Sequence, residues 1–257
     1  MLVRIALASG LLASTASADH HHDEMATVAE TPREFDASVS LIAASYGSPT
    51  TTYAGDYEGV IPALSWSRDR YSVGASVGLY RILLNGLDDV GLGDVTAHAS
   101  LRLHADDHLY AGVMLMVTAP TGDEIHGLGM GHTMAMPMAY GAWTTGRFTF
   151  AATGGYSRAL VQMEANHDHG VWPLVDPMNM SELTWAASAS YAIGHDLRGT
   201  ARVAGGIPIE LEGHTRVIGA ARLGWGARRL DTAVEIQTGL VGDPFTIRGL
   251  VETALHF

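Results

Sequence analysis

Histidine and methionine side chains concentrate at two places in the chain where they could bind a metal ion. The first is the segment DHHHDEM, which begins at Asp19. If export cleavage occurs after Ala18, the new terminal amine, two amides and the imidazole of His21 form a planar set of nitrogen ligands suited to Cu(II) or Ni(II). His20 and His21 are therefore candidate metal ligands. The alternative is a solvated His-rich tail that binds nothing.

The second place is a pair of stretches, 120–138 and 162–180, that contain or adjoin seven methionines. The candidate ligands there are His126, His132, His167 and His169. Thioethers select Cu(I), and imidazole suits copper or zinc. However, Met134, Met136 and Met138 share one parity with Tyr140, which is the pattern of a lipid-facing strand. Packing is the favoured interpretation of these three methionines. No cofactor is required by the sequence, and copper or another divalent metal is the alternative for the histidines.

One enzyme motif is present, G-x-S-x-G, from Gly74 to Gly78. A nucleophilic serine in this motif needs a strained turn between a strand and a helix. Ser76 instead lies inside an alternating segment, YSVGASVGLY, with no helix after it. Small residues on a barrel wall explain the motif, so we assign no catalytic residue and do not expect an enzyme.

The elements that carry these residues are strands. In the stretch from Gly91 to Ala119, two alternating segments are joined by the short polar turn 105–107. Val95, Leu101 and their neighbours of the same parity are apolar, while the opposite parity carries polar side chains such as His98 and Arg102. Side chains with a period of two point to opposite faces of a strand, so the stretch predicts an amphipathic hairpin.

The two ends of the chain indicate that the apolar face meets lipid. Residues 1–18 combine a basic start, a short apolar run and an Ala-Ser-Ala cleavage pattern, which is typical of a secretory signal peptide. Residues 19–33 are polar, and we interpret them as a flexible His-rich periplasmic lead-in. The last strand alternates and ends on Phe257, as in barrels that the outer-membrane assembly machinery recognises. We therefore expect residues 34–257 to form a barrel in the outer membrane of a Gram-negative bacterium.

Alternating segments of roughly ten residues recur about twelve times along this region. The connections between them alternate between tiny turns, such as 68–70 and 145–147, and longer stretches, notably 83–91, 120–132 and 162–180. This asymmetry predicts an all-β fold, a transmembrane antiparallel up-and-down β-barrel with short periplasmic turns and longer outer loops. An even strand count closes the sheet without an edge.

The polar parity of the strands predicts the lining of the barrel. The expected lumen-lining residues are Asp94, His98, Arg102, His104, Glu182, Arg198, Arg202, Arg222, Glu235, Arg248 and Glu252. The same parity carries Asp36, Arg216, Asp231 and His256. Charges of both signs allow two interpretations, a network of ion pairs that fills a narrow barrel and the wall of an open conduit.

Composition agrees with an exported barrel. The chain has no cysteine, so disulfide and thiol chemistry are excluded. Its formal charge of −12 argues against nucleic acid as a partner, because a phosphate backbone requires a basic surface.

The central residues resemble the outer-membrane barrel family called MetA-pathway of phenol degradation, whose members are described as transporters. The resemblance rests on Gly91-Leu92-Gly93-Asp94 at the start of one alternating segment and on Ala119-Pro120-Thr121-Gly122-Asp123 at the end of the next. The Met- and His-rich stretch 126–138 departs from the family's usual residues. The resemblance implies a barrel that passes small, aromatic or hydrophobic solutes.

We therefore expect a monomeric barrel that acts as a passive transporter or pore, with outer-membrane lipid and a small solute as its partners. The alternative is a copper-binding outer-membrane barrel that uses the His/Met-rich tail and loops.

Overall fold

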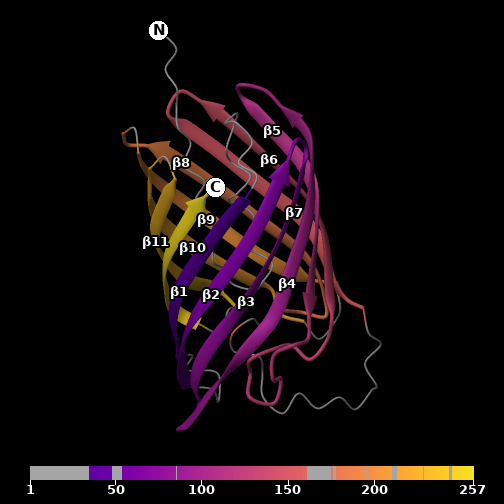
Figure 1. The fold of residues 1–257 in the computed structure, drawn as a ribbon. Helices are drawn as coiled ribbons and strands as arrows, with labels where there is room; N and C mark the ends of the chain where they lie inside the picture. Colours follow the sequence, from indigo (N-terminus) through magenta and orange to yellow (C-terminus); the bar gives the residue numbers. More distant parts are fainter. Residues whose placement is uncertain are drawn as a thin grey trace.

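The computed structural model describes residues 35–47, 54–84, 86–160, 175, 178–194, 196–209, 213–227, 229–242 and 245–257. These ranges form a closed barrel of antiparallel strands (Figure 1). In chain order the strands are β1 (Phe35–Gly47), β2 (Ala54–Arg68), β3 (Tyr71–Leu84), β4 (Leu87–Ala105), β5 (Leu109–Ala119), β6 (Met134–Thr145), β7 (Phe148–Ala159), β8 (Ser181–Ala192), β9 (Leu197–Pro208), β10 (Arg216–Gly226), β11 (Leu230–Val241) and β12 (Phe245–His256).

Each strand pairs with its neighbours in sequence, and β1 also pairs with β12, which closes the sheet. This confirms the predicted all-β, up-and-down barrel of twelve strands. The described ranges contain no helix that is long and apolar enough to cross a membrane.

The barrel carries apolar side chains outside, and most of the charged side chains of its strands point inside. On β12, Val251 and Leu255 are exposed, whereas Arg248 and Glu252 of the opposite parity are buried. A soluble barrel would show the reverse arrangement. A continuous apolar outer surface of this kind is what lipid covers in membrane barrels.

Aromatic rings encircle the end of the barrel where β12 finishes. Seven rings near this end are exposed: Phe35, Trp66, Tyr71, Phe148, Tyr191, Trp225 and Phe257. Neighbouring rings touch across strands, with centroids 6.5 Å apart for Phe35 and Phe257 and 4.9 Å apart for Phe148 and Tyr191. This is the arrangement of an interfacial aromatic girdle.

The connections at the girdle end are short, as predicted. Asp69 and Gly146 supply the left-handed backbone conformation, with φ of 55° and 58°, in the turns after β2 and β6. At the opposite end one prediction is wrong: residues 83–91 are not a loop. β3 continues to Leu84 and β4 starts at Leu87, and Arg81 donates two hydrogen bonds to Asp88 across the extended hairpin.

A second difference concerns Phe245, which the alternation places on the outer face. The register of β1 with β12 shifts between Ser45 and Tyr46. This irregularity reverses the parity at the start of β12, so Phe245 is buried inside the barrel while Ile247 stays exposed. A β-bulge redirects one side chain in this way, and strand periodicity alone cannot reveal it.

Candidate functional site

A charged wall occupies the inner face of β9 to β12. We use this name for Arg202, Arg222, Glu235, Arg248 and Glu252, all of which are buried. Arg222 Nη1 lies 3.2 Å from Glu252 Oε2 and 3.7 Å from Glu235 Oε2. Arg202 also interacts electrostatically with Glu235. Three guanidinium groups therefore face two carboxylates, which leaves this wall with an excess of positive charge.

Arg248 connects the rest of the charged wall to β2, on the other side of the closure between β1 and β12. Its Nε donates to Gln237 Oε1 at 2.7 Å, and its Nη1 donates to the hydroxyl of Tyr57 at 3.1 Å. Its guanidinium carbon lies 4.2 Å from the ring centroid of Phe245, a cation–π contact that is strong when desolvated. Gln237 in turn donates to Glu235. The network thus runs continuously from β2 to β11.

A second buried network lies near the girdle end. The imidazole of His256 contacts Asp231 Oδ2 through Nε2 at 2.8 Å and Asp36 through Nδ1. These contacts tie together β11, β12 and β1, the strands on either side of the closure.

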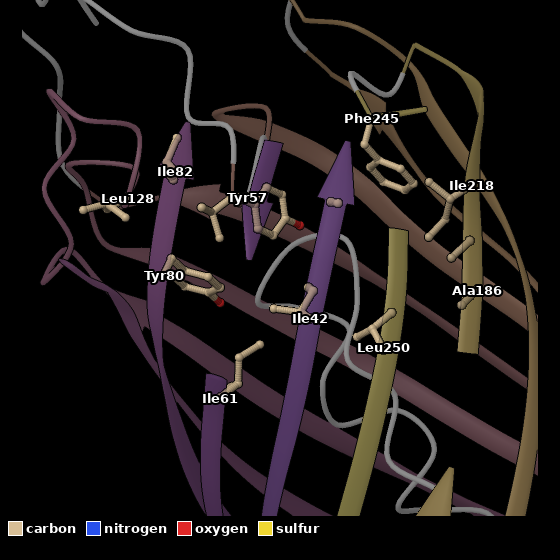
Figure 2. Close-up of a cluster of buried hydrophobic side chains, with 13 residues drawn as sticks. Ile42, Tyr57, Ile61, Tyr80, Ile82, Leu128, Ala186, Ile218, Phe245 and Leu250 are labelled. Carbon is tan, nitrogen blue, oxygen red and sulfur yellow. The ribbon is translucent and has the colours of Figure 1, made fainter. Parts of the chain in front are cut away.

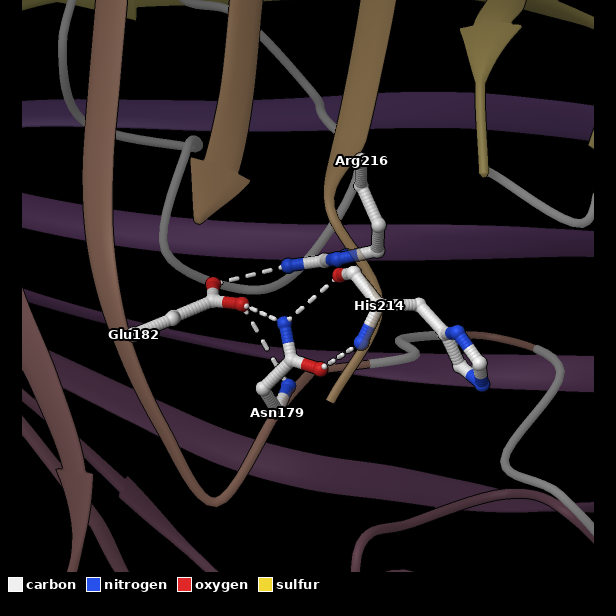
Figure 3. Close-up of polar contacts among 4 residues, drawn as sticks. All are labelled: Asn179, Glu182, His214 and Arg216. Atoms are coloured by element: carbon white, nitrogen blue, oxygen red, sulfur yellow. Dashed lines mark hydrogen bonds and ion pairs between the residues drawn. The ribbon is translucent and has the colours of Figure 1, made fainter. Parts of the chain in front are cut away.

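A third network joins β8 and β10 near the end of the barrel opposite the girdle (Figure 3). Arg216 Nη2 donates to Glu182 Oε1 at 2.8 Å. The Asn179 amide donates to Glu182 and to the carbonyl oxygen of His214, and Asn179 Oδ1 accepts a hydrogen bond from the His214 amide at 2.9 Å. This network fastens the residues just before β8 to those just before β10.

The segment between β5 and β6 folds into the barrel. We call residues 120–133 the inward segment, because Leu128, Met130 and His132 within it are buried. The carboxylate of Asp94, on β4, accepts hydrogen bonds from two backbone amides of the inward segment. The Gly122 amide donates to Oδ1 at 2.9 Å, and the Met130 amide donates to Oδ2 at 2.8 Å. One side chain on the wall therefore holds both limbs of the segment.

The two motifs that carry the family resemblance meet at this point. Thr121 accepts a hydrogen bond from the Val95 amide at 2.8 Å and donates to the Gly93 carbonyl at 3.1 Å. A Cβ at Gly91 would lie 2.6 Å from Leu128, and one at Gly93 would lie 2.6 Å from the Tyr80 ring. The glycines thus leave the space into which Leu128 and Tyr80 fit.

Leu128 joins an apolar group inside the barrel with Tyr57, Tyr80 and Ile82 (Figure 2). The rings of Tyr57 and Tyr80 meet edge to face with centroids 6.0 Å apart. Because Tyr57 also contacts Arg248, the apolar group and the charged wall are adjacent. The interior therefore offers apolar and cationic surfaces side by side.

Methionine side chains line the inner face of β5 and β6. The prediction that Met134, Met136 and Met138 face lipid is wrong, because all three are buried inside the barrel. They pair across β5 with Thr118, Met116 and Met114 respectively. The outer parity of β6 carries Ala, Pro and Gly before Trp143, so the more apolar parity of this strand is the inner one. A rule that assigns the more apolar face of each strand to lipid therefore fails for β6.

The other residues expected in the lumen differ in how deeply they are buried. Asp94, His98 and Glu182 lie inside, and Arg198 is partly buried. Arg102 is partly buried at the girdle end, where it donates to the Asp69 carbonyl and lies 6.0 Å from the Tyr110 centroid. His104 is exposed instead, and its Nε2 pairs with Asp106 at 2.9 Å. A register shift between Arg102 and His104 accounts for this difference.

The predicted metal ligands do not form a common site within the described ranges. His20, His21, His167 and His169 lie outside the described residues. His126 is exposed and hydrogen-bonds Asp123 through Nδ1 at 2.7 Å, while His132 is buried. No group of three His, Asp or Glu side chains among the described residues could hold a metal ion.

The exposed pair has shifted protonation equilibria. The hydrogen bond and the charge of Asp123 raise the pKa of His126 above its ordinary 6.5, with a further contribution from Asp89. The same hydrogen bond lowers the pKa of Asp123 below 3.8. Both side chains are therefore charged across a wider pH range than either would be alone.

Ser76 lies within β3 and is buried. The strand continues past it to Leu84, so the strand-to-helix turn of a nucleophile elbow does not form there.

Three interior residues carry no sequence pattern that predicts their role: Tyr57, Asn179 and Gln237. Tyr57 and Gln237 appear as ordinary polar members of their strands, and only the barrel register brings them to Arg248. Asn179 lies in a stretch without periodicity. The one available signal was the pairing of polar residues with the same parity on β11 and β12, where Gln237 lies opposite Arg248.

Comparisons with known proteins identify the fold. No family model matches the chain, and no curated protein matches it. The COG4313 outer membrane channel from Pseudomonas putida F1 superimposes with a TM-score of 0.68 at 12% identity, over 90% of this chain and 97% of that one. KdgM porin gives 0.56 at 9% identity over 86% and 99%. NanC porin gives 0.54 at 10% identity over 87% and 100%. The chain thus has the barrel fold of outer-membrane channels and porins.

Proposed function

We propose that the protein is a passive outer-membrane channel for small solutes. The observation that carries this proposal is the pairing, inside one lumen, of an anchored inward segment with a buried charged wall. Burying an ion costs several kcal/mol even after relaxation, and well-packed apolar residues would serve a purely structural barrel as well. In the proposed channel these charges lie along the path of the permeating solute, as rings of charged side chains do in selective pores.

The membrane location rests on the outer surface. An apolar belt bounded by an aromatic girdle matches a bilayer with its interface, and short turns at the girdle end match a periplasmic side. In this proposal residues 1–18 direct export, residues 19–33 form the periplasmic lead-in, and the strand ending at Phe257 is recognised by the barrel assembly machinery. Membership of the phenol-degradation transporter family is part of the same proposal.

The interior chemistry favours small solutes with an apolar or aromatic part. Tyr57, Tyr80 and Phe245 supply ring surfaces, and Arg248 contacts two of these three residues. A small aromatic molecule would form offset-stacked or edge-to-face contacts with these rings, which a saturated solute cannot form. One chain closes its own barrel, so a monomer is sufficient for transport.

Planar-bilayer recording on the refolded mature protein tests the proposal. We expect discrete conductance steps, with transient blockades when a small aromatic solute such as benzoate is added. Cyclohexanecarboxylate, which has the same charge and similar size but no aromatic ring, serves as the matched control and should give weaker blockades. A folded barrel that gives no steps at any voltage would overturn the proposed function.

A further inference from the structure

The interior methionines form one cluster. We call the following residues the methionine cluster: Met114, Met116, Met130, Met134, Met136, Met138 and Met178. They come from β5, β6, the inward segment and the residue stretch just before β8, and each is less than a tenth exposed. Met116, Met134 and Met136 are fully buried. Segments far apart in sequence thus deliver thioethers to one place.

The barrel register sets these side chains against one another. Met116 pairs with Met136, and Met114 pairs with Met138, as direct neighbours on β5 and β6. Directly opposed residues have Cβ atoms about 4.5 to 5.5 Å apart, so two flexible thioether chains can reach a common ion. Met130 enters from the inward segment, whose position depends on Asp94. The cluster is therefore held from the wall and from the segment.

Packing alone does not explain where methionine occurs. The large apolar side chains on the outer surface of the described residues are Leu, Val, Ile and aromatics, with no methionine among them. Among the described methionines only Met180 lies outside the cluster. If methionine served merely as an apolar filler, the outer face would use it too. Its confinement to one interior patch indicates that the sulfur atoms matter.

The donor chemistry selects the ion. The side chains that define the cluster are thioethers, whereas a hard dication prefers oxygen ligands. Thioethers bind soft Cu(I), and Ag(I) shares that chemistry. A monovalent soft ion also leaves less uncompensated charge inside the barrel than a dication.

We propose that the methionine cluster is a binding site for a soft monovalent metal ion, Cu(I) or Ag(I), with Met116 and Met136 at its centre. The site differs from the histidine sites expected in the tail and loops, because its ligands are thioethers inside the barrel. It goes beyond the proposed channel, since binding can be measured whether or not the barrel conducts.

Ag(I) is the probe, because it needs no reductant. Equilibrium dialysis of the refolded barrel against silver nitrate in chloride-free buffer, followed by metal analysis, measures its affinity. The test variant is the double change Met116→Leu and Met136→Leu, which conserves volume and is tolerated best in packed interiors. Met180→Leu is the matched control. We expect the double variant to bind Ag(I) at least about tenfold more weakly, since changes even beyond the direct ligands of metal sites cost that much.

Two results would overturn the proposal: Ag(I) affinity in the double variant equal to that of the native barrel, or an equal loss in Met180→Leu. A second measurement covers misfolding of the variant. In the native protein, bound Ag(I) should slow the peroxide oxidation of Met178, the most exposed member of the cluster, to sulfoxide, as read by mass spectrometry, while Met180 is oxidised as before. Absence of this protection would also contradict the proposed metal site. Conductance is recorded separately, so a silent barrel that still binds silver contradicts only the channel.

Discussion

Asp94 and Met130 are 36 residues apart in the chain, yet the Met130 amide donates to Asp94 Oδ2 at 2.8 Å. The same carboxylate receives the Gly122 amide at 2.9 Å, so a single side chain fixes both limbs of a segment that lies inside the barrel. The position of this segment inside the barrel therefore depends on one partly buried acceptor.

The first prediction concerns this acceptor. Asp94→Asn keeps one oxygen but turns an amide nitrogen toward the second donor, so at least one hydrogen bond to a charged group, worth about 1.5 to 3 kcal/mol, is lost. We expect the inward segment to loosen, single-channel conductance to rise and protease cleavage within 120–133 to become faster. Asp107→Asn, an exposed residue at the girdle end, is the control. Unaltered conductance and cleavage in Asp94→Asn would show that other contacts hold the segment.

The second prediction concerns ion selectivity. Glu252→Gln removes a negative charge 3.2 Å from Arg222 while preserving the shape of the side chain. Charged rings in a lumen set the sign of the permeating ion, so we expect the reversal potential in a salt gradient to shift toward anions. Glu58→Gln neutralises an exposed partner of Arg81 and should cause no shift. Equal reversal potentials for Glu252→Gln and the native barrel would place this wall outside the ion path.

The third prediction concerns pH. Because the pKa of His126 is raised in the folded protein, the stabilisation of the fold by its pairing with Asp123 is fully present below pH 6.5. It is lost as the pH rises through the folded-state pKa. The lowered pKa of Asp123 means that its contribution is present above pH 3.8 and is lost as pH falls. Both contributions are therefore present together between pH 3.8 and pH 6.5. An NMR titration should give a His126 midpoint above 6.5 that falls in Asp123→Asn but not in Asp107→Asn; equal midpoints in all three proteins would contradict the pairing.

The fourth prediction concerns the close approach at Gly93. An alanine Cβ there would lie 2.6 Å from Tyr80 and 3.3 Å from the Leu128 carbonyl. Overpacking of this kind costs about 1 to 3 kcal/mol, so Gly93→Ala should lower the thermal unfolding temperature in detergent. A Cβ at Gly154 meets nothing within 4 Å, and Gly154→Ala is the matched control. Identical unfolding temperatures would mean that Tyr80 moves aside without cost.

Alternation along the strands predicted most of the fold, because lipid outside and a polar lumen inside impose opposite demands on successive residues. All the strands were found, and the turns at Asp69 and Gly146 were placed correctly. The extended hairpin at Arg81 and Asp88 was missed, although Asn85-Gly86 is a two-residue hairpin signal in the sequence.

The interior was less predictable. Arg222 and Glu252 were expected in the lumen from parity alone, but their pairing depends on register between strands that the sequence does not state. Phe245 and His104 were misplaced because local register shifts reverse parity. Residues 120–132 were predicted to be an outer loop, and whether such a loop folds inward was left open. The position of the inward segment depends on Asp94, a contact across 28 and 36 residues that no local pattern encodes.

The contact between His256 and Asp36 spans 220 residues. It belongs to the β1–β12 pairing, which is formed by the two described strands farthest apart in sequence. Ordering such a long stretch of chain carries a large entropic cost before any contact offsets it, so high contact order makes this pairing a slow step. Until β12 arrives, β1 and β11 each present an unsatisfied row of backbone amides and carbonyls. During biogenesis the half-made sheet is therefore an aggregation hazard that must be shielded until its last strand docks.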